Sequence, residues 1–347
     1  MSLLEFTPSG IYCPQADVHL DPWRPVNKAL ITHGHSDHAS WGHGSYLCTT
    51  SAAAVIRHRL NLTGNLHSVP YNKQLYINGV EFSFHPAGHI PGSAQIRVAY
   101  QGEVWVFSGD YKLQYDGISE PFEPVKCHTF ITESTFGLPV YKWKPQQEVF
   151  NDINEWWRKN QSRGKVTVLA GYALGKSQRI LKNVEASIGK IMVHGAIDSI
   201  TEIFRSQGLP LPETTYVTTE MKKKDFDGAL VVCPPSAVGS PWLKKFEPYS
   251  LGIASGWMGL RGARRRRGAD RGFVLSDHAD WLELNQAVAE TGAERVFVTH
   301  GYSEIFARWL REKGLDAAEV KTQYEGELSE IAESGIDESK EESKTES

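Results

Sequence analysis

The sequence predicts an α/β protein, and three observations lead to that prediction. Short runs rich in β-branched and aromatic residues alternate with amphipathic stretches along most of the chain. Histidine and aspartate recur just after several of these runs, where active sites of open α/β sheets lie. The 347 residues are sufficient for about two domains, each with its own core.

Nine runs are candidate strands because apolar and β-branched residues gather in them and turn residues flank them. The stretch 151–160 and two stretches around Leu284 and Trp309 show the apolar spacing of three and four that indicates helices. The candidate strands occupy residues 29–32, 81–84, 104–108, 129–132, 165–170, 190–193, 229–233, 272–276 and 295–299.

A change of character near residue 140 divides the chain. A Pro-containing connection leads into the middle region there, and a Gly- and Arg-rich stretch at about 256–272 closes that region. We therefore expect a discontinuous domain from residues 1–143 and 270–324, with a second domain inserted at 144–269. Residues 325–347 are acidic and poor in apolar residues, so we expect a disordered tail.

Composition excludes several classes of protein. No apolar run reaches the roughly 18 residues of a membrane span, and we expect neither a secretory signal nor a membrane partner. The four cysteines are scattered without a Cys-x-x-Cys pair, which favours a reducing compartment, the cytoplasm. The net charge of −4 combines a tail at −7 with a body at +3, so a nucleic-acid partner remains compatible with it.

The strongest motif is THGHSDH at residues 32–38, directly after a candidate strand. Imidazoles at alternate positions can converge on one divalent metal, and the Asp–His pair that follows can reach a second. Three further side chains stand just past other strands, and a solvated surface role is improbable for the whole set. The candidate ligands are His33, His35, Asp37, His38, His89, Asp110 and His300.

These motifs resemble those of the metallo-β-lactamase fold. TEST at 132–135 and SDHAD at 276–280 resemble two motifs of its β-CASP nuclease branch, and LAGYALGKSQR at 169–179 resembles the opening of the β-CASP insertion. Segments such as PAGHIPGSAQIRV and GFVLSDHADW are similar to bacterial DNA-ligase-associated exonucleases, described as ligase-associated DNA damage response enzymes. The similarity covers about residues 5–325.

The resemblance implies an αββα sandwich, the metallo-β-lactamase domain, with an inserted α/β β-CASP domain. It also implies two divalent metals, which can activate water and clamp phosphate oxygens. Zinc suits this His/Asp set, and manganese is compatible with it. By resemblance His33, His35 and His89 hold the first metal, Asp37, His38 and His300 hold the second, and Asp110 bridges them.

Asp37, His278 and Glu133 are the candidate catalytic residues. The resemblance assigns His278 as general acid, with Glu133 orienting its imidazole. The alternative for His278 is a residue at the start of a helix, with Ser276 or Asp277 as N-cap.

Two basic segments are candidates for contact with substrate phosphates. Gly171 and Gly175 bracket three residues, one fewer than a Walker A loop, so phosphate contact by Lys176 and Ser177 is favoured over ATP binding. The densest positive cluster precedes the SDHAD motif, and its alternative is a solvated loop. The arginines expected to contact phosphate there are Arg264, Arg265, Arg266 and Arg267.

The function predicted from these features is that of a two-metal exonuclease on DNA, in repair alongside a DNA ligase and a helicase. A ribonuclease is the first alternative, because His300 occupies a motif position where β-CASP enzymes acting on RNA carry histidine. A small-molecule metallo-hydrolase and a non-catalytic DNA-binding module are further alternatives. The large insertion disfavours the hydrolase, and the complete ligand set disfavours the binding module.

Overall fold

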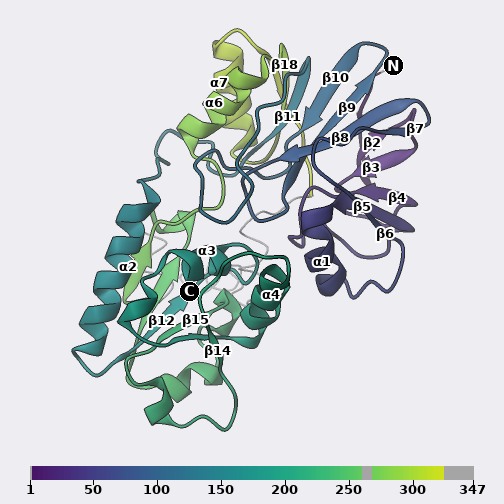
Figure 1. Cartoon of the computed structure of the whole chain (residues 1–347). Coiled ribbons are helices and arrows are strands. Elements are labelled where there is room, and N and C mark those ends of the chain that lie inside the picture. Colours follow the sequence, from purple (N-terminus) through teal and green to yellow (C-terminus); the bar gives the residue numbers. More distant parts are fainter. Residues whose placement is uncertain (1, 260–267, 324–347) are drawn as a thin grey trace, which may run out of the picture.

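The protein is a mixed α/β structure, as predicted, with three sheets in the residues that the computed structural model describes, 2–259 and 268–323 (Figure 1). The six strands of the first sheet pair in chain order, antiparallel from β1 to β3 and parallel from β3 to β6. They are β1 (Glu5–Thr7), β2 (Gly10–Cys13), β3 (Val18–Leu20), β4 (Lys28–Leu30), β5 (Ser45–Thr49) and β6 (Leu66–Val69).

The second sheet has seven strands in the order β19-β18-β11-β10-β9-β8-β7. The four strands from β7 to β10 form an antiparallel meander, and β10, β11, β18 and β19 are parallel. Since β11 pairs with β18, the chain leaves this sheet and returns to the adjacent position after a long excursion. The strands are β7 (Leu75–Ile77), β8 (Val80–Pro86), β9 (Ala94–Tyr100), β10 (Glu103–Phe107), β11 (Thr129–Ser134), β18 (Arg295–Gly301) and β19 (Asp316–Glu319).

These two sheets face each other across one apolar core. Leu30 of the first sheet and Phe84, Ile96 and Trp105 of the second are buried in it together. Each side chain of this size contributes roughly 1.5–3 kcal/mol when fully buried. The period of two along each strand sends the neighbouring residues to the opposite faces.

Helices cover those opposite faces. Ile31, next to Leu30, packs with Ile56 of helix α1 (Thr50–Arg59). On the second sheet, Phe130 packs with the two C-terminal helices, predicted from their apolar spacing. These helices are α6 (Trp281–Thr291) and α7 (Ser303–Glu312).

The excursion between β11 and β18 builds the third sheet, in which all six strands are parallel, in the order β14-β13-β15-β12-β16-β17. Its central strands are buried throughout, as parallel sheets require. The elements are α2 (Gln146–Gln161), β12 (Val166–Ala170), α3 (Lys176–Asn183), β13 (Ile191–Val193), α4 (Gly195–Ser206), β14 (Thr215–Tyr216), β15 (Leu230–Cys233), β16 (Tyr249–Ala254) and β17 (Arg271–Phe273).

All nine predicted runs contain a strand, and the described residues hold ten more, most of them short. The strand expected at 272–276 is shorter in the structure and ends at Phe273, because the chain then leaves the third sheet. That strand lies just past the expected domain boundary at residue 269. Within the described ranges, no helix is both long and apolar enough for a membrane crossing.

Candidate metal centre

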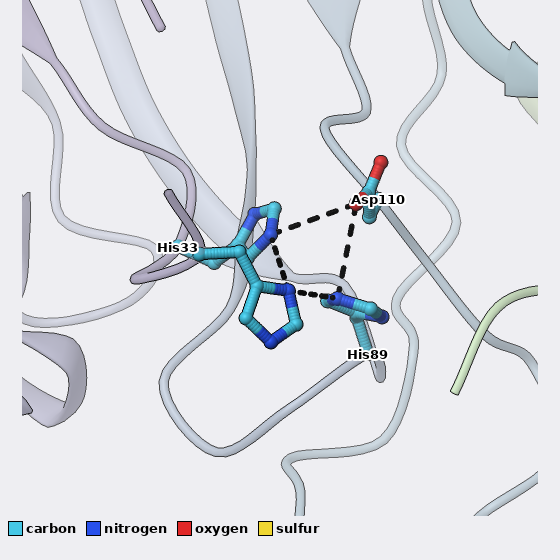
Figure 2. Close-up of side chains that lie close together, drawn as sticks. His33, His89 and Asp110 are labelled. Atoms are coloured by element: carbon cyan, nitrogen blue, oxygen red, sulfur yellow. Dashed lines mark hydrogen bonds and ion pairs between the residues drawn. The ribbon is translucent and has the colours of Figure 1, made fainter. Parts of the chain in front are cut away.

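Four side chains from three strand ends converge on one point. His33 and His35 follow β4, and His33 Nε2 lies 3.2 Å from His35 Nδ1. His89, in the loop after β8, places Nε2 3.1 Å from the same Nδ1. Asp110, just after β10, places Oδ2 3.6 Å from His33 Nε2 and 3.8 Å from His89 Nε2. Figure 2 shows His33, His89 and Asp110 pointing toward one another, and the four ligand atoms lie within 4.8 Å of one another.

A second group shares Asp110. His38 Nε2 lies 3.4 Å from Asp110 Oδ2 and 3.7 Å from Asp37 Oδ2. His300, at the end of β18, places Nε2 3.2 Å from the other carboxylate oxygen, Asp110 Oδ1. The structure thus brings together all seven side chains expected as ligands, with the Asp110 carboxylate between the two groups.

The hydrogen bonds around the first group fit a cation. His35 Nε2 lies 3.2 Å from the Leu174 carbonyl and His89 Nδ1 lies 2.8 Å from the Asp277 carbonyl, so each nitrogen donates its hydrogen there. A neutral imidazole has a single N–H, so His35 Nδ1 and His89 Nε2 present lone pairs to each other at 3.1 Å. Two facing lone pairs repel unless a positive charge lies between them, and outer acceptors of this kind are typical of metal-binding histidines.

Thr32 and Asp21 orient the imidazoles of His33 and His38. The Thr32 hydroxyl donates to the Asp21 carboxylate, so its oxygen accepts from His33 Nδ1 at 3.0 Å. Asp21 Oδ2 also accepts from His38 Nδ1 at 2.7 Å. Each imidazole therefore turns its other nitrogen, Nε2, toward Asp110. Gly109 allows this approach with a φ of +56°, because a Cβ there would lie 2.7 Å from the Thr32 hydroxyl oxygen.

Burial determines the protonation of these groups. It lowers the pKa of His33 and of His89 well below the ordinary value, so both are neutral ligands at pH 7. Burial acts in the same direction on His38, but the Asp110 and Asp37 carboxylates outweigh it and raise the pKa of His38 well above the ordinary value. The second group is thus a site where buried carboxylates attract positive charge.

The two residues assigned by resemblance to proton transfer meet in the structure. His278 Nδ1 lies 3.1 Å from Glu133 Oε1 and 2.9 Å from Oε2, and both side chains are buried. The Tyr111 amide donates to Oε1 at 2.8 Å and so helps to hold the carboxylate. The His278 ring centroid lies 4.6 Å from that of His89, which puts it beside the first group. The N-cap of α6 is Asp280 and not Ser276 or Asp277, because Asp280 accepts from the Leu282 and Glu283 amides.

Comparison with known proteins identifies several relatives of this chain. No protein-family model matches the chain. A "Probable DNA ligase" of Opitutus terrae is 33% identical over 89% of this chain, which spans 30% of that protein. The "DNA cross-link repair protein SNM1" of Arabidopsis thaliana is 23% identical over 50% of the chain and 38% of its own length. The "Probable RNase MJ4" of Methanocaldococcus jannaschii is 24% identical over 74% of the chain and 71% of its own length.

These relatives are β-CASP proteins of the metallo-β-lactamase fold. The predicted resemblance of this chain to that family is thereby confirmed. A crystal structure of a protein of unknown function from Enterococcus faecalis V583 shares the fold, with a TM-score of 0.54 at 10% identity over 78% of this chain and 74% of that one. The chain spans less than two fifths of the length of the first two relatives.

The other predicted site residues lie partly inside and partly outside the described structure. Lys176 begins α3, with Nζ 3.5 Å from Asp277 Oδ2 and 4.3 Å from the centroid of the Tyr172 ring. The Ser177 hydroxyl donates to the Gly171 carbonyl at 3.2 Å, inside the loop. Phosphate contact by either residue stays a prediction. The run Arg264 to Arg267 lies outside the described residues, as does the tail expected to be disordered.

Three residues of the candidate site were missed by sequence reasoning. Asp21 orients His38 and Thr32, Asp277 orients His89, and Arg179 donates to Asp277 Oδ1 at 3.0 Å. Asp277 and Arg179 lie inside the SDHAD and GKSQR segments, so those motifs were the available signal. Asp21 lies in YCPQADVHLDPWRPV at 12–26, which is also similar to the ligase-associated exonucleases, but that similarity assigned Asp21 no role.

A cavity of about 480 Å³ adjoins the metal centre. Its walls come from the loop after β4, from the end of α1 and from residues 173–174, 194–200 and 234–236 around the third sheet. The cavity therefore lies between the part of the chain that forms the first sheet and the part that forms the third. Several of its polar side chains can donate hydrogen bonds or carry positive charge. Among the lining residues are His35, Ser36, His58, Arg59, Leu174, His194 and Ser199.

Proposed function

We propose that this protein is a two-metal phosphodiesterase that acts as an exonuclease on DNA. The observation that carries the proposal is the convergence of seven His and Asp side chains around Asp110, beside the paired His278 and Glu133. The layer order of helix, sheet, sheet and helix, with the third sheet inserted, supports the αββα sandwich with a β-CASP domain.

Different residues of the chain would bind the metals, orient the ligands and donate the proton. His33, His35 and His89 would hold one ion, and Asp37, His38 and His300 the other, with Asp110 between them. Such ions, zinc by ligand type, neutralise phosphate oxygens and lower the pKa of water. Thr32 and Asp21 hold the imidazoles of His33 and His38 in the ligand tautomer. His278, oriented by Glu133, gives a proton to the leaving oxygen, which would otherwise depart as an alkoxide.

The DNA ligase relative supports DNA as substrate and association with a ligase, because its match covers 89% of this chain. A repair role agrees with the name of the Arabidopsis relative. The four cysteines are free and buried in the described structure, which supports a reducing compartment such as the cytoplasm. A helicase partner stays a prediction.

Ribonuclease activity is the second candidate, favoured by the names of several relatives and by His300 beside Asp110. Incubating metal-loaded protein with end-labelled single-stranded DNA, duplex DNA and RNA separates the two. We expect mononucleotides from DNA and none from an Asp37→Ala variant. Release of mononucleotides from RNA alone would identify RNA, and not DNA, as the substrate. Hydrolysis of thioesters or lactams, with both nucleic acids left intact, would rule out the proposed nuclease activity.

Removal of metal is expected to lower stability as well as activity. An ion that binds only the folded state stabilises it by about 2.7 kcal/mol at a free concentration 100 times its Kd. Chelated protein should therefore unfold several degrees lower than protein supplied with Zn²⁺, as measured by differential scanning fluorimetry. An identical Tm with and without Zn²⁺ would argue against a metal site of this affinity.

The arginine run is expected to contribute to the salt dependence of DNA binding. Removal of one side chain that neutralises a phosphate reduces the slope of log K against log salt by about 1. The double variant Arg265→Ala/Arg266→Ala should thus bind more weakly, with a slope about 2 smaller, by fluorescence anisotropy. Arg158→Ala/Arg163→Ala, two exposed positions in or just after α2, is the matched control. An unchanged slope in the first variant would assign the run to a solvated loop.

A further inference from the structure

The segment Ser276–His278 joins the third sheet to α6 and serves both halves of the candidate site. Its Asp277 carbonyl accepts the Nδ1–H of His89 at 2.8 Å. Its His278 side chain points to Glu133, with Nδ1 2.9 Å from Oε2. A shift of this short segment would therefore move a metal ligand and the proton donor together.

Arg179 of α3 forms hydrogen bonds with the same segment, Ser276–His278. Its Nη1 donates to the Ser276 carbonyl at 2.6 Å and to Asp277 Oδ1 at 3.0 Å, and its Nε donates to Gln146 Oε1 at 3.0 Å. The side chain is 2% exposed. Gln146 and Arg179 both belong to the inserted domain, so this domain fixes the guanidinium and the guanidinium fixes the segment.

The contact is strongly ionic. Burial alone would raise the pKa of the Asp277 carboxyl, but the charges of Lys176 and Arg179 outweigh it and hold the pKa below its ordinary value. Asp277 is thus an anion held inside the protein by cations from α3. Replacing one partner of such a buried pair leaves the other without full compensation, so the segment would move or rehydrate.

A second contact joins the loop just before α3, in the inserted domain, to the first metal group. The Leu174 carbonyl accepts from His35 Nε2 at 3.2 Å. The next residue, Gly175, has a φ of +86°, and a Cβ there would lie 2.2 Å from Ile90 Cγ2, beside His89. Two of the three histidines in the group therefore have their outer hydrogen-bond acceptors placed by residues 174–179.

We propose that Arg179 is a positioning residue that sets the geometry of His89 and His278, so that the affinity and form of the metal centre depend on docking of the inserted domain. The inference rests on the proposed metal centre and adds a residue that acts through Asp277. Outer hydrogen-bond partners of metal ligands typically change metal affinity or activity about 10–100-fold when removed.

The test compares full-length protein with Arg179→Met after loading with Co²⁺, whose visible absorption reports ligand geometry. Lys182→Met is the matched control, because Lys182 lies on the same helix and donates to the Pro210 carbonyl at the surface. We expect Arg179→Met to bind Co²⁺ about 10–100-fold more weakly, with an altered spectrum. Its kcat should fall while KM stays unchanged, and Lys182→Met should match the wild type.

Arg179→Lys covers the outcome in which Arg179→Met does not fold. Lysine keeps the charge but has a single nitrogen, so it cannot reproduce the planar group that bonds Gln146 through Nε and the Ser276–His278 segment through Nη1. We therefore expect a smaller change of the same kind. A folded variant at position 179 with wild-type Co²⁺ affinity, spectrum and kcat would overturn the proposal. If the wild type binds Co²⁺ but shows no nuclease activity, the proposed function is rejected. The inference about Arg179 would still stand, because it depends on Co²⁺ affinity and spectrum.

Discussion

Asp110→Ala is expected to lose at least about 10³-fold in kcat on DNA. Asp110 contacts both candidate metal groups, with oxygens 3.6 Å from His33 Nε2 of the first and 3.2 Å from His300 Nε2 of the second. The ions are asked to supply several kcal/mol of transition-state stabilisation, and each 1.36 kcal/mol is tenfold in rate. Single-turnover hydrolysis of end-labelled DNA, together with metal content by mass spectrometry, measures the effect.

Asp17→Ala is the matched control for this substitution. Asp17 is an exposed carboxylate that lies 3.7 Å from Lys28 Nζ, outside the candidate site. Its variant should retain metal and wild-type kcat. An Asp110→Ala protein that holds two ions and cleaves DNA at the wild-type rate would show that the two groups do not share this carboxylate.

His278→Ala is expected to lose about 10²–10⁴-fold in kcat, the contribution typical of a general acid. The loss should shrink on a phosphodiester with a nitrophenol leaving group, since that group departs without a proton. Metal content should stay at the wild-type value, because the seven candidate ligands remain. Steady-state kinetics on the two substrates measures the difference.

His85→Ala is the control for that experiment. His85 also faces a carboxylate, with Nδ1 3.3 Å from Glu123 Oε1, but neither residue belongs to a candidate metal group. We expect wild-type kcat for this variant. Equal losses for His278→Ala on DNA and on the nitrophenyl substrate would exclude His278 as the proton donor.

The parts of the site that were predictable lie at strand ends. His33, Asp110, Glu133 and His300 each follow or end an apolar run, and parallel pairing of β10, β11 and β18 brings three of these ends together. Apolar periodicity predicts the strands, and the turn that follows places the polar side chain. The local pattern was therefore enough to find the candidate ligands.

The supporting residues were not predictable in the same way. Asp21 lies in a loop after β3, and its partner His38 is 17 positions away. Arg179 and Asp277 are separated by 98 positions and meet only because α3 packs against the segment between β17 and α6. Contacts of this kind depend on tertiary packing, and no spacing along the chain encodes them.

A metal titration of chelated protein tests the central claim most directly. Zn²⁺ or Mn²⁺ is added stepwise while bound metal and DNA hydrolysis are measured in the same sample. We expect hydrolysis to be absent without metal and to reach its maximum as binding approaches two ions per chain. Full hydrolysis in excess chelator, or two bound ions with neither DNA nor RNA cleaved, would contradict the account.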